Sequence, residues 1–191
     1  MKTAALVLAA GLGTRMGGGK MMVEWNGRPL PVWPVMAAIE AGCDPVVAVV
    51  GPESGDLDSA LLSAGARVMV NPRPGDGQAS SLVCGLAAVG GADRLFVLLG
   101  DMPLVAPHHL RALMAALDNA CGPTIAAPVF NGRRGNPVLF DKSHFTALAA
   151  LSGDQGARAL IGGPHTILVE MTDRAVLADI DTPEDLAALG G

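Results

Sequence analysis

The chain has 191 residues, half of them hydrophobic, and a formal net charge of −5. This length suits one domain over residues 1–191 with a sizeable core, and the negative charge argues against nucleic acid as a partner. Cys43, Cys84 and Cys121 are odd in number and widely spaced, so they form neither a disulfide framework nor a zinc motif. The sequence has no signal-peptide pattern and no apolar run long enough to span a bilayer, so we expect a cytoplasmic protein without a membrane partner.

Short apolar runs alternate with helical patterns over the first two thirds of the chain. The predicted strands are Thr3–Leu8, Pro45–Val50, Arg67–Val70, Arg94–Leu99 and Thr124–Ala127. The predicted helices between them are Val32–Ala41, Leu57–Ala64, Ala79–Val89 and Pro107–Asn119. This alternation predicts an α/β fold, Rossmann-like and doubly wound, with a mostly parallel sheet and helices on both faces.

The last third of the chain loses this regular alternation. Here we predict strands at Pro137–Phe140 and Thr166–Glu170, helices at Lys142–Leu151 and Pro183–Leu189, and a helical turn at Ala157–Ile161. The loss of alternation predicts a small antiparallel edge and a substrate flap.

The first strand ends at Leu8 to Gly11 and continues into a loop with five glycines, Arg15 and Lys20. Glycines let backbone N–H groups approach an anion, and the two cations supply counter-charge, so we predict a cradle for a nucleoside triphosphate. The loop is no P-loop, because Met21 follows Lys20, and no dinucleotide fingerprint, because Met16 replaces its last glycine. A flexible glycine-rich turn is the alternative.

Two further loops follow strands at the same predicted edge, where ligands bind in open α/β sheets. Asp101 follows the fourth strand and should project into the crevice, where a carboxylate can hold Mg²⁺ against a triphosphate. A turn aspartate before Pro103 is the alternative. The loop with Gly77, Ser80 and Ser81 can contact a base or ribose, or Ser80 can cap a helix.

Asp181 precedes Thr182 and Pro183, which begin a helix. That helix start does not explain Asp179 and Asp181, which we place on a strand beside Asp101, and either one can complete a metal site. For the turn at Arg133, we favour a solvated surface over binding of an anionic second substrate. His108 and His109 begin a helix, and the four histidines receive no role.

Together these features indicate transfer of a nucleotidyl group, in which an acceptor phosphate attacks the α-phosphorus and pyrophosphate leaves. The opening segment from Leu8 to Lys20 resembles the signature of nucleotidyltransferases of the molybdenum-cofactor type, and most closely the molybdenum cofactor cytidylyltransferases. The resemblance covers nearly the whole length. Later matching segments are 71–82, 99–103, 132–138, 153–158 and 179–186.

The resemblance implies transfer of CMP from CTP to molybdopterin with Mg²⁺, or with Mn²⁺ in its place. It implies catalytic roles for Arg15, Lys20 and Asp101, and a metal held by Asp101 and Asp181. The residues that it places at the nucleotide are Leu8, Ala9, Ala10, Gly11, Gly13, Thr14, Arg15, Lys20, Asn71, Gly77, Ser80, Ser81 and Gly100. The residues that it places at the acceptor are Arg134, Asn136, Asp154 and Arg158. A recipient molybdoenzyme is an expected partner.

Two features qualify these expectations. Ala10 is the residue that the family associates with CTP, although one methyl group discriminates between bases by only about 1–3 kcal/mol. Asn136 stands where the family often has histidine, and asparagine cannot titrate near neutral pH. The alternatives are a guanylyltransferase, a nucleotidyltransferase for a sugar or alditol phosphate, and a non-catalytic carrier of the finished cofactor.

Overall fold

The computed structural model describes residues 1–11, 19–122, 124–154 and 156–189. Its strands are β1 (Thr3–Ala9), β2 (Glu24–Trp25), β3 (Arg28–Pro29), β4 (Val46–Val50), β5 (Arg67–Val70), β6 (Arg94–Leu99), β7 (Ile125–Phe130), β8 (Arg133–Arg134), β9 (Val138–Asp141) and β10 (Thr166–Glu170). Its α-helices are α1 (Val32–Glu40), α2 (Asp56–Ser63), α3 (Gln78–Leu86), α4 (Pro107–Asn119), α5 (Phe145–Ala149) and α6 (Pro183–Ala188). Its 3₁₀ helices are η2 (Lys20–Met22), η3 (Pro74–Asp76), η4 (Lys142–His144), η5 (Gly156–Leu160), η6 (Gly163–His165) and η7 (Arg174–Leu177).

One eight-stranded sheet forms the centre of the described structure, in the order β10-β7-β9-β6-β1-β4-β5, with β8 paired to β7. The expected mostly parallel sheet is confirmed, and its antiparallel strand β9 lies between β6 and β7. A separate antiparallel hairpin joins β2 and β3. The strands that follow β1 in sequence are added first on one side, as β4 and β5, and then on the other side, as β6. The strand order thus reverses at β1, and ligands of open α/β sheets bind at the carboxyl ends of the strands on either side of such a reversal, here β1 and β6.

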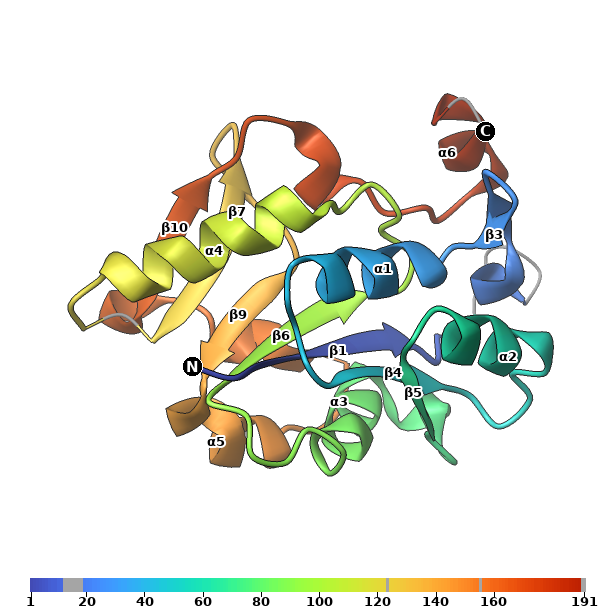
Figure 1. Cartoon of the computed structure of the whole chain (residues 1–191), viewed down its shortest axis with the longest axis horizontal. Helices are drawn as coiled ribbons and strands as arrows, with labels where there is room; N and C mark the ends of the chain where they lie inside the picture. Colours follow the sequence, from blue (N-terminus) through green and yellow to red (C-terminus); the bar gives the residue numbers. More distant parts are fainter. Residues whose placement is uncertain (12–18, 123, 155, 190–191) are drawn as a thin grey trace.

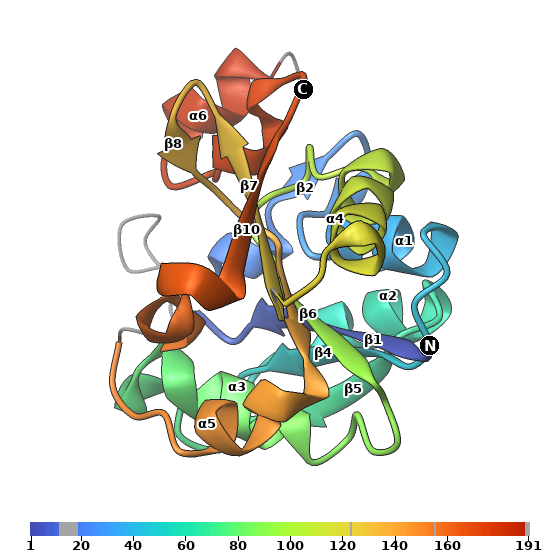
Figure 2. The same ribbon diagram turned by 90° about the vertical axis from the view of Figure 1, so that its left-hand side faces the viewer.

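Helices cover both faces of the sheet, with α1, α2 and α4 on one side and α3 and α5 on the other (Figures 1 and 2). The side chains of β1 alternate between the two resulting cores. Ala5 and Val7 belong to the cluster that contains residues of α1, α2 and α4, whereas Leu6 and Leu8 belong to the cluster that includes α3. All of β1 is therefore buried, which explains why the strand reads as one continuous apolar run.

The predicted bounds of Arg67–Val70, Arg94–Leu99, Pro107–Asn119 and Thr166–Glu170 are confirmed. The predicted helix Lys142–Leu151 is wrong in form, because it divides into η4 and α5 and ends at Ala149. Its first turn is tightened by Asp141, whose carboxylate accepts a hydrogen bond from the Ser143 N–H at 2.9 Å. In the described part of the chain, no helix is both long and apolar enough to cross a membrane.

The turn between β8 and β9 packs tightly against η7. The Asn136 N–H donates to the carbonyl oxygen of Val176 at 2.9 Å, and the Val176 side chain is fully buried. A Cβ atom added at Gly135 would overlap that same carbonyl oxygen. A backbone atom cannot rotate out of the way as a side chain can. Any residue larger than glycine at position 135 would therefore push the turn away from η7.

We therefore expect Gly135→Ala to lower the free energy of unfolding by roughly 1–3 kcal/mol, as overpacking does in protein cores. The measurement is urea unfolding of both proteins at one temperature. Gly90→Ala is the matched control, because a Cβ atom there would meet nothing within 4 Å. Equal losses for the two variants would contradict the close contact at Gly135.

Candidate active site

The carboxyl ends of β1 and β6 bring Gly11 and Asp101 to one cavity. Leu8 pairs with Leu99 in the parallel ladder, and the Gly100 N–H donates to the Leu8 carbonyl oxygen at 2.9 Å. A Cβ atom at Gly100 would lie 3.0 Å from that oxygen, so glycine lets the two strand ends approach without a shift of the backbone. Asp101 then follows at the mouth of the crevice. Gly13, Thr14 and Arg15 lie outside the described residues.

Lys20 lies between the carboxylates of Asp101 and Asp181. Its Nζ atom is 2.7 Å from Asp101 Oδ2 and 2.6 Å from Asp181 Oδ1, while its side chain is only 8% exposed. Burial disfavours the ammonium, but the hydrogen bonds and negative charges of the two carboxylates outweigh it and raise the pKa of Lys20. The lysine is therefore charged at neutral pH, and it joins segments that are far apart in the sequence.

Asp101 has one oxygen available for a cation. Its Oδ2 atom bonds to Lys20, whereas Oδ1 is buried and has no hydrogen-bond partner among the described residues. Desolvation, and to a smaller extent the negative charges of Asp101 and Asp181, raise the pKa of Asp179, so the three carboxylates lie close enough to interact. Carboxylate oxygens are the ligands that Mg²⁺ and Mn²⁺ prefer, so this group fits a divalent cation.

The segment with Asp179 and Asp181 is extended, but the predicted strand there is wrong. A backbone hydrogen bond from the Ile180 N–H to the Asp101 carbonyl oxygen, at 2.9 Å, joins this segment to Asp101. The Asp181 N–H instead donates to Asp185 Oδ2 at 3.0 Å, in the cap of α6, so no ladder continues. The Thr182 side chain accepts from the Asp185 N–H, as the sequence predicted for this helix start.

Five of the ten described residues predicted at the nucleotide line one cavity of about 380 Å³. Its lining includes Leu8, Ala10, Gly11, Gly77, Ser81, Asp101 and Asp154. A second cavity of about 390 Å³ on the other side of Ala10 is lined by Ala9 and Lys20. Gly77 has a φ of +93°, and a Cβ atom there would lie 2.5 Å from the carbonyl carbon of Gly153. Only glycine allows this contact between the two loops.

Asn71 and Ser80 brace this loop. The Asn71 amide is buried and donates to Ser80 Oγ at 2.8 Å and to Ser81 Oγ at 3.0 Å. The Ser80 hydroxyl donates to the Gly77 carbonyl oxygen at 2.8 Å. Ser80 is therefore not the N-cap of α3, a position held by Gly77.

The four residues predicted at the acceptor lie on different elements, although β8 reaches the segment after η5, where Arg134 Nη1 donates to the Ile161 carbonyl oxygen at 3.5 Å. Asp154 lines the 380 Å³ cavity, and Arg158 lies exposed in η5. Arg134 lies exposed on β8, while Asn136 is bonded through its backbone to η7.

A larger cavity, of about 460 Å³, adjoins Asp179 and Ile180. Arg133 and Arg174 line it, and neither forms an ion pair with any described residue. Arg133, interpreted above as a solvated turn residue, thus lies at a cavity wall. Sequence analysis missed Arg174 because the cavity forms from segments about 40 residues apart in the chain, and no local pattern marks the segment with Arg174.

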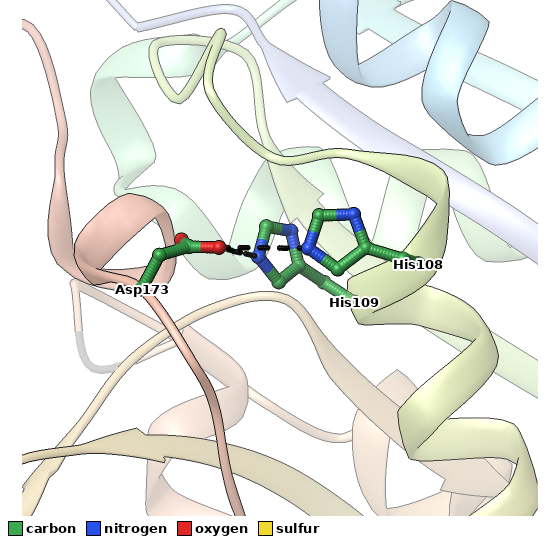
Figure 3. A group of neighbouring side chains, drawn as sticks. All are labelled: His108, His109 and Asp173. Carbon is green, nitrogen blue, oxygen red and sulfur yellow. Dashed lines mark hydrogen bonds and ion pairs between the residues drawn. The ribbon is translucent and has the colours of Figure 1, made fainter.

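A further group that sequence analysis missed consists of His108, His109 and Asp173 (Figure 3). One possible metal-ligand atom from each residue lies within 4.8 Å of the other two. His109 is buried, whereas the side chains of His108 and Asp173 are 60% and 45% exposed. Asp173 lies 64 residues from His109, so the sequence carries no signal for the pairing.

Residues 5–170 match the family described as MobA-like NTP transferase domain. The chain is 30% identical over 190 residues to purine catabolism protein PucB of Bacillus subtilis, which covers 93% of this chain and 91% of PucB. It is 26% identical over 182 residues to molybdenum cofactor cytidylyltransferase of Escherichia coli K12, which covers 94% and 91% of the two chains.

Two solved structures extend this comparison. Rv0371c from Mycobacterium tuberculosis, solved in complex with manganese, is 27% identical with a TM-score of 0.79, covering 99% of this chain and 98% of that one. The structure of CMP:2-keto-3-deoxy-manno-octonic acid synthetase complexed with CTP has a TM-score of 0.74, with 99% and 97% coverage. At 15% identity, it shows a common fold alone.

The stability of the protein should fall as the pH drops from 7 to 5. Burial lowers the pKa of His109 and of His144 below the usual 6.5, so the unfolded chain binds protons that the folded chain does not. Each histidine then contributes stability above pH 6.5 that is lost below it, at up to about 1.4 kcal/mol per pH unit. Thermal unfolding across this range measures the slope, which should be shallower in His109→Asn. An unchanged slope in that variant would contradict the assignment.

Proposed function

Because the chain belongs to the family of MobA-like NTP transferase domains and is a nucleotidyltransferase, we propose that it transfers CMP from CTP to molybdopterin. The observation that carries this proposal is the meeting of Lys20, Asp101 and Asp181 beside a cavity lined by Ala10, Gly11 and Gly77. A cation-binding group and a glycine-walled cavity at one sheet edge are what nucleotidyl transfer from a triphosphate requires.

In the proposed reaction, a phosphate oxygen of molybdopterin attacks the α-phosphorus of CTP. A new P–O bond forms, the bond from the α-phosphorus to the α,β-bridging oxygen breaks, and that oxygen leaves with pyrophosphate. A bound Mg²⁺ would supply positive charge to the triphosphate. The protein contributes position and charge, so no nucleophilic side chain is needed.

Asp101 has a double role in this proposal. Its Oδ1 atom would hold the divalent cation, while Oδ2 keeps the Lys20 ammonium in place. Asp181 holds the same ammonium from the other side, and either Asp181 or Asp179 would complete the set of carboxylates. Lys20 and Arg15 would neutralise the triphosphate and the departing pyrophosphate.

The acceptor would carry negative charge. We propose Arg134, Asn136, Asp154 and Arg158 as its contacts, and the 460 Å³ cavity offers two further guanidinium groups, Arg133 and Arg174, beside Asp179. An anionic, phosphate-bearing acceptor fits these groups, because arginine binds phosphate through paired hydrogen bonds. Recipient molybdoenzymes would then take up the product.

We expect Asp101→Asn to reduce pyrophosphate release roughly 100-fold or more, the scale of losing one preorganised electrostatic contact. The fold should survive, because the amide occupies the same volume. Asp44→Asn is the matched control, since the Asp44 side chain is 79% exposed and its nearest cation, Lys2, lies 3.8 Å away. A fully active Asp101→Asn enzyme would remove Asp101 from the proposed metal site.

Pyrophosphate release with CTP, GTP, UTP and ATP in turn, with Mg²⁺ and molybdopterin, tests the choice of nucleotide. We expect CTP to be preferred, and Ala10→Gly to shift the preference toward GTP by roughly 10- to 200-fold, the range for one small group in a pocket. Ala10 is buried at the cavity wall, so its methyl group limits the space for a base. Release with GTP alone would indicate a guanylyltransferase instead. Release with none of the four would favour another phosphorylated acceptor or a carrier.

A further inference from the structure

The hydrogen bonds of His109 fix which of its ring nitrogens carries the proton. The Ala106 N–H donates to His109 Nδ1 at 3.0 Å, so Nδ1 is an acceptor and a neutral ring must carry its proton on Nε2. Nε2 lies 3.2 and 3.1 Å from the two carboxylate oxygens of Asp173 (Figure 3). The Nε2–H group therefore donates to Asp173, and the ring has no lone pair left for another ligand.

This arrangement disfavours a metal ion at the histidine pair, although the spacing of the three side chains would suit one. A metal on His109 Nε2 would move the ring proton to Nδ1, where it would face the Ala106 N–H. The cap of α4 would then be lost. His108 is 60% exposed and only 3.5 Å from Asp173 Oδ2, so it adds a second, weaker contact to the same carboxylate.

His109 and Asp173 join the two segments that carry the candidate site carboxylates. His109 lies in the first turn of α4, which begins after the loop that follows Asp101. Asp173 caps η7 by accepting from the Ala175 N–H at 2.8 Å, and η7 leads directly to Asp179 and Asp181. The same two segments meet again where the Ile180 N–H bonds to the Asp101 carbonyl oxygen. They are thus tied together at both ends.

We propose that His109 and Asp173 are positioning residues that hold the Asp101 loop against the segment 178–181 and so set the spacing of the carboxylates. The inference deepens the proposed function and rests on it. Neither residue lines the cavities at Ala10 and Lys20. The hydrogen bond from the Ala175 N–H to Asp173 and the packing of Gly135 on Val176 hold η7 in place. Because segment 178–181 follows η7 directly, its position depends on η7.

Two variants of His109 separate its two hydrogen bonds. In His109→Asn, the amide oxygen can replace Nδ1 as the acceptor for Ala106, but the side chain is too short to reach Asp173. In His109→Gln, the amide nitrogen can replace Nε2 as the donor to Asp173, while the cap is lost. His144→Asn is the control for a half-buried, hydrogen-bonded histidine elsewhere, because His144 bonds to Thr124 at 2.7 Å.

The first readout is hydrogen exchange of the Ile180 amide, followed by NMR without nucleotide or cation. We expect exchange roughly 3- to 10-fold faster in His109→Asn, the scale of one lost hydrogen bond, and near wild type in His109→Gln and His144→Asn. The second readout is Mn²⁺ affinity, measured by electron paramagnetic resonance, which should fall by a similar factor in His109→Asn alone. All three variants should have a lower Tm.

If the exchange rate of the Ile180 amide rises in proportion to the decrease in Tm in all three variants, His109 only stabilises the fold, and the proposal is overturned. So would Zn²⁺ binding by the wild type that both His109 variants abolish, because the group would then be a metal site. If the exchange result holds while Asp101→Asn retains pyrophosphate release, the proposed function fails and the positioning role stands. If Asp101→Asn is inactive and exchange is unchanged, the positioning role fails alone.

Discussion

A buried ammonium held between two carboxylates is the constraint on which the site depends. Lys20, Asp101 and Asp181 come from the loop after β1, the end of β6 and the segment before α6. A buried charge without a partner is strongly destabilising. The three segments therefore stabilise one another, because each supplies a charge that the others need as a partner. The glycine at position 100, the Ile180–Asp101 hydrogen bond and the cap of α6 all bring the three groups to one point.

The sheet topology supplies the remaining geometry. Parallel strands on both sides of β1 send their loops to one edge, and β7 and β10 run in the same direction as β6 because the antiparallel strand β9 separates them. The second half of the chain thereby adds its own loops to the edge where Gly11 and Lys20 lie. The cavity between segments 130–133 and 174–189 adjoins the candidate metal site for this reason.

Much of the fold could be predicted because β1, β4 and β6 are apolar along their whole length and their helices end in recognisable turns. The proximity of Asp101 to Asp181 was also predictable, since Thr182 and Pro183 explain the helix start but not the aspartate before it. Contacts between side chains that are far apart in the sequence and carry no motif were not predictable. Asp173 and Arg174 follow no local pattern, and their roles arise only where η7 meets α4 and the β7–β8 turn. The short strands β2, β3 and β8 have two residues each, too few to show alternation.

The separation of Lys20 from Asp181 along the chain, 161 residues, has a consequence for how the protein is made. During synthesis, Lys20 and β1 leave the ribosome before β6, and Asp181 follows later still. Contacts of such long range close slowly, and domains of this size commonly pass through partly folded intermediates. The Lys20 ammonium therefore stays hydrated until β6 brings Asp101 to it, and its second carboxylate partner arrives only when the segment before α6 docks.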